Sequence, residues 1–425
     1  MANSAVTVLS LGLSLLFAVY ATRYYAYSIV TLRNWKPIDP PPEEAAFVTL
    51  LLPIYNEPAR LINRLLNACI GTEFPRYEII VADDSSDPET LRAYDAWKDN
   101  PRVKIVHRDT REGFKGGAMN NALRFADPRW THAVIFDADY VPMPDTVFQL
   151  LSRFEDEKVA AVQGYQHHDL NDSETWVTRG ARVNYTAWQL TDFPARSVLK
   201  TFIPLGGSAM IVRRKVLEEV EMFSPTIAED WDLSVKIHLK GYRVLYDDSI
   251  RVSAECPSRL RQWLRQQMRW AEGTTILFRK YCWKVLKSPN MGLQAKMNYL
   301  MDVSIYLQAV PMLLVSIVLA SRVFWPSLTA AALPYYFALP LLVYLGAVPF
   351  TSGAIGFRRD GATRKLYWLP LGLLLTYIAM PFAAYSAFKG FVLNKGTFTV
   401  TKKTGFSAHE GNHQLVQLPA NTQEL

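Results

Sequence analysis

The segment YEIIVADDSSD, residues 77–87, decides how the middle of this chain folds. It begins as a short run rich in isoleucine and valine, which is typical of a buried strand, and it ends in a polar cluster. Comparable runs occur at residues 47–57, 103–109 and 130–142. Helical spacing occurs between them, at residues 60–69 and 116–126. This alternation predicts an α/β domain built on a mixed, mostly parallel sheet.

The composition predicts a membrane protein. Of the 425 residues 50% are hydrophobic, which is high for a soluble enzyme. Four long apolar segments cover residues 5–22, 297–320, 330–355 and 366–388, and about 20 such residues suffice to cross a bilayer. The first predicts an N-terminal anchor. A cleaved signal peptide is the alternative, but the first residues are not basic and the apolar run is longer than such peptides need.

The distribution of charge and cysteine indicates a cytoplasmic middle region. Basic residues concentrate in GFRRDGATRK (356–365) and follow the first apolar segment, as expected for cytoplasmic loops. The three cysteines form neither a metal-binding pattern nor a disulfide framework. The net charge of +7 suits an anionic membrane surface or an anionic substrate. No nucleic-acid-binding motif occurs, so we expect no such partner.

Two pairs of carboxylates follow predicted strands. Asp83 and Asp84 end one strand, and Asp137 and Asp139 follow another. Open α/β sheets bind ligands beyond the carboxyl ends of their strands. Because no glycine-rich phosphate motif is present, we expect Mg²⁺ or Mn²⁺ on Asp137 and Asp139 to hold a diphosphate. The alternative is that these aspartates only begin turns.

Two further segments carry candidate site residues. Lys115 is a candidate for contact with phosphate or ribose, or else an ordinary solvated lysine. Glu229 and Asp230 precede an amphipathic helix predicted over residues 231–239 and ended by Gly241. Asp230 is therefore a candidate general base at a helix N-terminus, and a helix cap is the alternative.

The segment RQWLRQQMRWAEG (261–273) mixes arginine and tryptophan before the chain becomes apolar. In a helix beginning at Pro257, we expect Arg261, Arg265 and Trp263 to lie on the membrane surface, as an amphipathic interface helix would explain. Helical spacing places three other residues on a second face, predicted to turn toward the active site: Gln266, Arg269 and Trp270.

Four motifs occur in order: DDS (83–85), DAD (137–139), AED (228–230) and QQMRW (266–270). Through this combination the chain from Phe47 to Gly405 resembles the membrane-integrated, processive family 2 glycosyltransferases, which include cellulose, hyaluronan and plant mannan or glucomannan synthases. The resemblance implies a GT-A fold, with a Rossmann-like sheet, and transmembrane helices. It also implies inverting transfer from a nucleotide sugar, with UDP-glucose expected, to a β-linked polysaccharide secreted through the protein's own channel.

Other functions stay open at this point. A mannan or glucomannan synthase would use GDP-mannose instead. A non-processive enzyme would glycosylate a membrane lipid, as ceramide glucosyltransferases do. A scaffold or transporter with a degenerate nucleotide fold is the non-enzymatic alternative.

The resemblance also implies roles for single residues. Asp83 and Asp84 would contact the nucleoside, and Asp139, with Asp137, would bind the metal. Asp230, beside Glu229, would be the catalytic base. The remaining roles are diphosphate binding by Gln266 and Arg269, with Lys115 as a further donor contact, and acceptor binding by Trp270, Gly207 and Ser208. TFTVTKKTG (397–405), in isolation only a β-prone run with lysines, resembles a gating loop formed by Phe398, Val400, Thr401 and Lys402.

These expectations give a domain plan and a topology. We expect the plasma (inner) membrane to hold the protein, with its catalytic domain in the cytoplasm. A gating loop on that side requires residues 366–388 to lie at the interface or re-enter. The predicted regions are an N-terminal membrane helix (1–35), a GT-A domain (36–255), QxxRW and interface helices (256–295), membrane or interface helices (296–392) and a gating loop with a tail (393–425).

Overall fold

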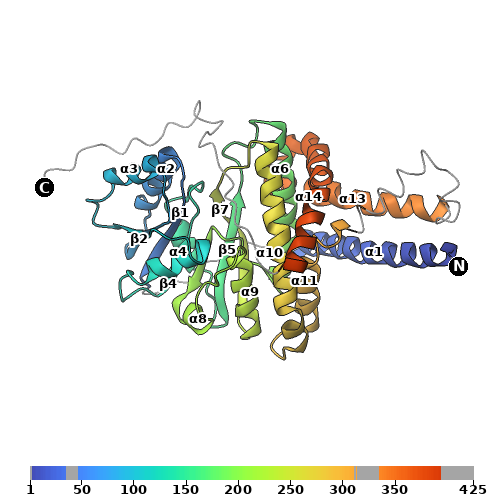
Figure 1. Cartoon of the computed structure of the whole chain (residues 1–425), viewed down its shortest axis with the longest axis horizontal. Helices are drawn as coiled ribbons and strands as arrows, with labels where there is room; N and C mark the ends of the chain where they lie inside the picture. The colour runs from blue at the N-terminus through green and yellow to red at the C-terminus, as the bar shows by residue number, and fades with distance from the viewer. Residues whose placement is uncertain (1, 35–45, 311–312, 314–334, 394–425) are drawn as a thin grey trace.

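The computed structural model describes residues 2–34, 46–310, 313 and 335–393 (Figure 1). The predicted gating residues Phe398, Val400, Thr401 and Lys402 lie outside the described residues, as do residues 311–312 and 314–334.

Seven strands of the described chain form one sheet, in the order β3-β2-β1-β4-β6-β5-β7. β1 is parallel to β2 and β4, whereas β6 is antiparallel to both of its neighbours, so the predicted mixed, mostly parallel sheet is confirmed. The first four strands correspond to the apolar runs of the sequence. The bounds are β1 Val48–Ile54, β2 Tyr77–Asp83, β3 Val103–His107, β4 His132–Ile135, β5 Val159–His167, β6 Met210–Arg213 and β7 Arg243–Ser253.

Helices cover both faces of this sheet. Along β1, Leu50 and Leu52 belong to one apolar core and Leu51 to the other, because successive strand residues point to opposite faces. The first core packs against α2 and α5, and the second packs against α4, α8 and α9. These helices are α2 Ala59–Ile70, α3 Pro88–Ala93, α4 Phe114–Leu123, α5 Thr146–Leu151, α8 Arg214–Glu219 and α9 Glu229–Leu239.

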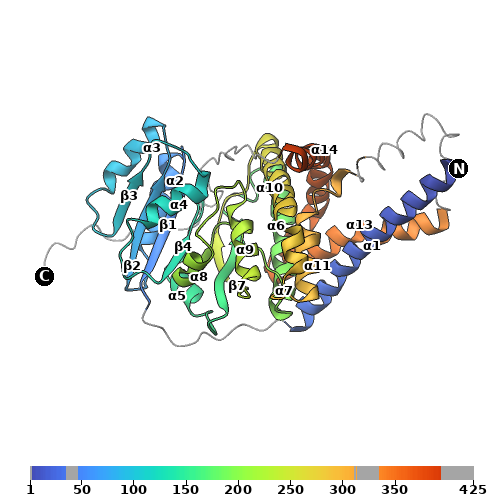
Figure 2. The same cartoon turned by 60° about the horizontal axis from the view of Figure 1, so that its bottom comes forward.

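A second layer of helices lies beside the sheet domain (Figures 1 and 2). It contains α6 Trp176–Ala187, a π-helical turn Trp188–Asp192, α7 Phe193–Val198, α10 Leu260–Lys287, α11 Leu293–Val303 and α14 Leu369–Leu393. α14 packs tightly on its neighbours, since a Cβ at Gly390 would lie 2.7 Å from the backbone oxygen of Glu272 in α10. The layer thus forms one boundary of the sheet domain.

Two long helices extend away from this layer. α1 (Ala2–Asn34) and α13 (Tyr335–Arg359) run side by side, and α14 lies across their direction (Figures 1 and 2). Within the described part of the chain, one helical segment, Thr363–Val392, is by length and composition apolar enough to cross a membrane. That segment contains residues 366–388, so their predicted place at the interface stays a prediction.

The predicted apolar span 297–320 does not begin as one continuous helix. α11 ends at Val303, and a turn follows over residues 304–308. Its one charged residue, Asp302, is only 4% exposed and is paired with two arginines, so this helix end is fixed inside the protein.

The same aspartate belongs to a buried network of charges that attaches α1 to the second layer. Arg23 of α1 donates to Asp192 and to Asp302, each at 3.1 Å. Arg196 of α7 pairs with the same two carboxylates, at 2.7 Å for its Nη2 bond to Asp302. All four side chains are less than a tenth exposed. Buried charges are tolerated only when paired in this way, so the network fixes how α1 is docked.

Candidate active site

The candidate site lies at the carboxyl ends of the central strands. β1 lies between β2 and β4, and the chain reverses its direction of winding there, which is the position where open α/β sheets bind ligands. Asp83 is the last residue of β2, and Asp137 comes two residues after β4. The sheet therefore brings the two predicted pairs of carboxylates to the same edge.

Lys115 is a largely buried, paired lysine rather than a solvated one. Its side chain is only 16% exposed and extends from the first turn of α4. Nζ donates to Asp137 Oδ1 at 2.6 Å and to the backbone oxygen of Gly207 at 2.7 Å. Glu229 Oε1 lies 3.7 Å away. One ammonium thus joins the DAD motif, the predicted acceptor loop and the helix that carries the candidate base.

Asp230 lies in the first turn of α9, which begins two residues earlier than predicted, at Glu229. Burial, followed by the neighbouring Glu229 carboxylate, raises the pKa of Asp230 to about 7, while the charges of Lys115 and Arg269 act in the opposite direction. A carboxylate with a pKa near neutrality is suited to general base catalysis. Ala228, at the N-cap position, provides no side-chain cap, and Asp230 Oδ1 accepts the backbone N–H of Trp231 at 2.8 Å, so the carboxylate also satisfies a donor of the first helical turn.

The loop before β6, which contains Gly206, Gly207 and Ser208, lies against both Asp230 and the Lys115–Asp137 pair. Gly207 has φ +79°, and a Cβ there would lie 2.8 Å from Asp230 Oδ2, so only glycine fits beside the carboxylate. Ser208 Oγ accepts the Asp137 backbone N–H at 3.0 Å. Two glutamines from β5 hold the loop: Gln163 donates to the Ser208 oxygen at 2.9 Å, and Gln166 to the Gly206 oxygen at 2.9 Å. Sequence reasoning missed both glutamines, because β5 was not predicted.

The DAD motif offers oxygen ligands for a hard cation. Asp137 already holds a cationic group, the Lys115 ammonium, and Asp139 is 8% exposed two residues away. Over the described ranges, no group of three or more His, Cys, Asp or Glu side chains is assembled for a metal. The donor set therefore fits a divalent cation that takes one or two protein carboxylates and completes its shell with other oxygens.

Asp83 is held in a local network at the opposite end of the site. It is fully buried, and its oxygens accept from the Tyr94 hydroxyl at 2.7 Å and contact His107 Nδ1 at 2.6 Å. The hydrogen bond to Asp83 raises the pKa of His107. Asp83 thus ties β2 to β3 and to the helical turn at Tyr94. Direct nucleoside contact by its carboxylate, as the resemblance implies, stays a prediction.

Asp84 forms a two-pronged ion pair with Arg108, at 2.5 and 2.7 Å. Arg108 also donates to the backbone oxygens of Glu112 and Phe114, so it braces the loop that leads to Lys115. In the same loop Arg111 lies 3.5 Å above the ring of Tyr55, which follows β1. The sequence gives no local signal for these pairings, because each joins residues from different strand ends.

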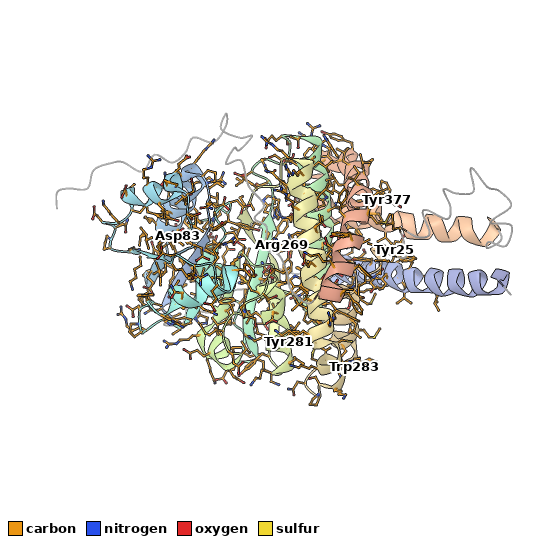
Figure 3. The ribbon with its side chains drawn as sticks, viewed as in Figure 1. Tyr25, Asp83, Arg269, Tyr281, Trp283 and Tyr377 are labelled. Carbon is orange, nitrogen blue, oxygen red and sulfur yellow. The ribbon has the colours of Figure 1, made fainter. Side chains whose placement is uncertain are left out.

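The QQMRW motif lies on α10 and faces the sheet domain through Tyr185 of α6. The Tyr185 hydroxyl donates to Gln266 Oε1 at 2.5 Å, and its ring centroid lies 6.1 Å from that of Trp270. Arg269 acts electrostatically on Asp230 and lies centrally, between the sheet and the outer helices, whereas Asp83 lies far across the domain (Figure 3). The predicted approach of the motif to the base is thus supported for Arg269.

The predicted position of Trp263 on the membrane surface is wrong. Trp263 is 2% exposed, and its ring lies 5.7 Å from Tyr185. In a helix, positions 263, 266 and 270 share one face, so Trp263 packs inward with the motif. Arg261 and Arg265 are exposed, as predicted. α10 begins at Leu260, after an extended Arg259, rather than at Pro257.

Comparison with known proteins agrees with this geometry. The family model "Glycosyltransferase like family 2" matches residues 43–273. The probable glucomannan 4-beta-mannosyltransferase 7 of Oryza sativa subsp. japonica is 27% identical over 419 residues, covering 92% of this chain and 68% of the relative. Glucomannan 4-beta-mannosyltransferase 7 of Arabidopsis thaliana is 27% identical over 314 residues, covering 71% and 56%. The chain thus spans roughly half to two thirds of the length of such relatives.

A solved structure shares the fold. It is the mannosyltransferase PcManGT from Pyrobaculum calidifontis in complex with GDP-Man and Mn²⁺, at 23% identity and a TM-score of 0.58. The match covers 88% of this chain and 96% of that one.

Proposed function

Because this chain belongs to glycosyltransferase like family 2, we propose that it transfers mannose from GDP-mannose to a β-linked mannan or glucomannan chain. The relatives are glucomannan 4-beta-mannosyltransferases by name, and the structure that shares the fold is a complex with GDP-Man. These names favour GDP-mannose over UDP-glucose, the donor expected from the sequence. Motif residues alone could not separate the donors, since both present a diphosphate to the same acids.

The observation that carries this proposal is the convergence on Asp230. Its carboxylate has a pKa near 7, abuts Gly207 and lies beside the Lys115–Asp137 pair. In the proposed reaction, Asp230 accepts the proton of the acceptor hydroxyl, whose oxygen attacks the anomeric carbon. The bond from that carbon to the diphosphate breaks on the opposite face, so the configuration inverts.

Positive charge stabilises the leaving diphosphate, which gains negative charge as its bond breaks. Lys115 and Arg269 are the cationic side chains placed to supply it, and stabilisation where charge develops is usually a large contribution to catalysis. A divalent cation, when bound, adds a Lewis acid at the same oxygens. Asp139 and Asp137 would hold that ion, and Lys115 would then move from Asp137 to phosphate.

The acceptor would enter from the side of the second helical layer. Trp270 is half-buried, and its indole offers a flat surface on which a sugar ring can stack. Gly207 and Ser208 border the opposite side, next to Asp230 and Asp137. Processive extension, and export between the protein's own helices, belong to the same proposal.

An exposed apolar surface supports association of this layer with a membrane. Trp283 of α10 is 70% exposed and Tyr377 of α14 is 53% exposed. Both lie on the side of the molecule from which α1 and α13 extend (Figure 3). Tryptophan and tyrosine favour the membrane–water interface. We therefore propose that α10, α11 and α14 rest on the cytoplasmic face of the plasma membrane, which α1 and α13 enter.

The proposal is tested with the purified full-length protein in lipid nanodiscs with Mn²⁺. GDP-mannose, UDP-glucose and GDP-glucose are supplied in parallel with a β-1,4-linked manno-oligosaccharide, and product linkage is analysed. We expect mannosyl transfer from GDP-mannose with a new β-linkage, and none from the Asp230→Asn variant. Transfer only from UDP-glucose, or an α-linked product, would contradict the proposal.

A lipid acceptor is a second candidate, favoured by the apolar surface that adjoins the helix carrying Trp270. The same reaction, run with membrane lipids and no oligosaccharide, separates the two. A single mannose on an extracted lipid supports the second candidate, whereas a product that lengthens with time supports polymer synthesis.

A further inference from the structure

A series of aromatic rings crosses from the DAD motif to the QQMRW motif. Tyr140, which follows Asp139, meets His168 edge-on with centroids 6.4 Å apart. His168 packs on Tyr185 at 4.1 Å, and Tyr185 lies 6.1 Å from Trp270. The four rings come from the end of β4, the end of β5, α6 and α10. They form a continuous packed path from the donor side of the site to the acceptor side.

Tyr185 is the member of this series that contacts α10 by hydrogen bond as well as by packing. It is 5% exposed, and burial raises its pKa well above the ordinary value, so its hydroxyl stays a donor at physiological pH. That hydroxyl bonds Gln266 Oε1. One side chain thus fixes the orientation of Gln266 while its ring limits the position of Trp270.

The candidate residues for the donor and for the acceptor lie in different parts of the fold, the sheet domain and the second helical layer. A contact that joins these parts, such as that of Tyr185, therefore matters for their relative position. Asp137, Lys115 and Asp230 are anchored to the sheet domain, whereas Gln266 and Trp270 are carried by a helix of the second layer. An error of about 1 Å between reacting groups can cost a hundredfold in rate. Tyr185 packs against both parts, through His168 on one side and Trp270 on the other.

We propose that Tyr185 is a positioning residue that sets Trp270 relative to the catalytic carboxylates, and that its hydrogen bond to Gln266 fixes α10, so that it determines acceptor use rather than donor binding. Gln266 is assigned to this contact rather than to the diphosphate role that the resemblance implies. The proposal rests on the proposed function in taking Trp270 as the acceptor platform. It assigns to Tyr185 no contact with the nucleotide and no proton transfer.

Kinetics in nanodiscs test the role. Tyr185→Phe keeps the ring and removes the hydroxyl, and Tyr185→Leu removes both. With GDP-mannose and Mn²⁺ we expect kcat/KM for a β-1,4-linked manno-oligosaccharide to fall about tenfold in Tyr185→Phe, as for loss of one buried hydrogen bond, and further in Tyr185→Leu. The Kd of GDP-mannose, from calorimetry, should change less than twofold. A matched control is Tyr246→Phe, a buried tyrosine whose hydroxyl has no partner among the described residues, and it should leave both quantities unchanged.

A measurement without substrate separates this inference from the proposed function. Thermal unfolding midpoints are compared for Tyr185→Phe, Gln266→Leu and the double variant. If the contact exists, the double variant should unfold at a midpoint no lower than that of the less stable single variant, because either substitution alone already removes the hydrogen bond. Additive midpoint shifts would overturn the inference whatever the donor proves to be. Coupled midpoints with an unchanged acceptor kcat/KM would also overturn it, since the contact would then be structural only. A wild-type protein that transfers no sugar refutes the proposed function, and with it the acceptor role of Tyr185.

Discussion

Replacement of Asp230 by asparagine should stabilise the protein while it stops the reaction. The carboxyl is half-buried beside Glu229, and its pKa is raised from 3.8 to about 7. The folded protein therefore holds this group in its charged form at a cost when the pH is above 7. Asparagine keeps the shape and carries no charge, so the cost is removed.

The magnitude follows from the shift. A change of about three pKa units corresponds to about 4 kcal/mol, and partial exposure to solvent reduces the expected gain to about 2 kcal/mol. The sign depends on pH. Because the folded pKa lies above the unfolded value, the wild-type protein loses stability as the pH rises from about 4 to about 7. The advantage of Asp230→Asn should be full at pH 8 and should fade toward pH 4.

Urea unfolding of both proteins in the same detergent, at pH 8 and pH 5, measures this difference. Asp232→Asn provides a matched control two residues along the same helix. Asp232 is fully buried and paired with Lys280 at 2.6 Å and with Tyr281 at 3.0 Å, so its neutralisation should destabilise the protein by about 2 kcal/mol. Transfer by Asp230→Asn should fall at least a hundredfold, with donor Kd nearly unchanged. A destabilised Asp230→Asn at pH 8, or one that retains full transfer, would refute the reasoning.

Three other changes test different parts of the site. The kcat/KM of the wild type should rise with pH and level off above about 7, following the ionisation of Asp230. Glu229→Gln should move the midpoint of this rise to lower pH, because the Glu229 charge helps raise the pKa of Asp230, and an unmoved midpoint would exclude this coupling. Gly207→Ala should lower kcat/KM at least tenfold and the free energy of unfolding by about 1 kcal/mol, because the residue has a positive φ and an added Cβ would meet Asp230. Wild-type values for both quantities would contradict the packing described for the loop. In urea unfolding, Trp263→Ala should lower the free energy of unfolding by about 3 kcal/mol, whereas Arg265→Ala should lower it by less than about 0.5 kcal/mol. Equally small effects of the two substitutions would mean that Trp263 lies on the surface after all.

Much of the catalytic domain could be predicted because its signals are local. The apolar runs at 47–57, 77–87, 103–109 and 130–142 each contain one of the first four strands, and the acids that follow them lie at one sheet edge. β6 has only four residues and runs antiparallel to its neighbours, so neither its length nor the alternation of strands and helices indicated it. β5 was not predicted either, and this hid the way its glutamines hold the loop at Gly207.

The contacts that complete the site join residues distant in the chain. Tyr185 meets a residue 81 positions away, and no property of the segment around it indicates that partner. Trp263 was misplaced for a different reason. Tryptophan near arginine is typical of interface helices, but the helical period groups Trp263 with Gln266 and Trp270, and packing against α6 determines which face is buried.

The buried charges at α1 have a consequence for synthesis of the chain. Arg23 is made early, whereas its partner Asp302 lies 279 residues later. At about 5–20 residues per second, the ribosome needs roughly 15 to 55 seconds to deliver that partner. The other partner, Asp192, is made earlier, 169 residues after Arg23, so the buried charges of the folded protein become available in two steps. The docking of α1 can therefore be completed only after α11, which carries Asp302, has been translated, because buried charges are tolerated only when they are paired.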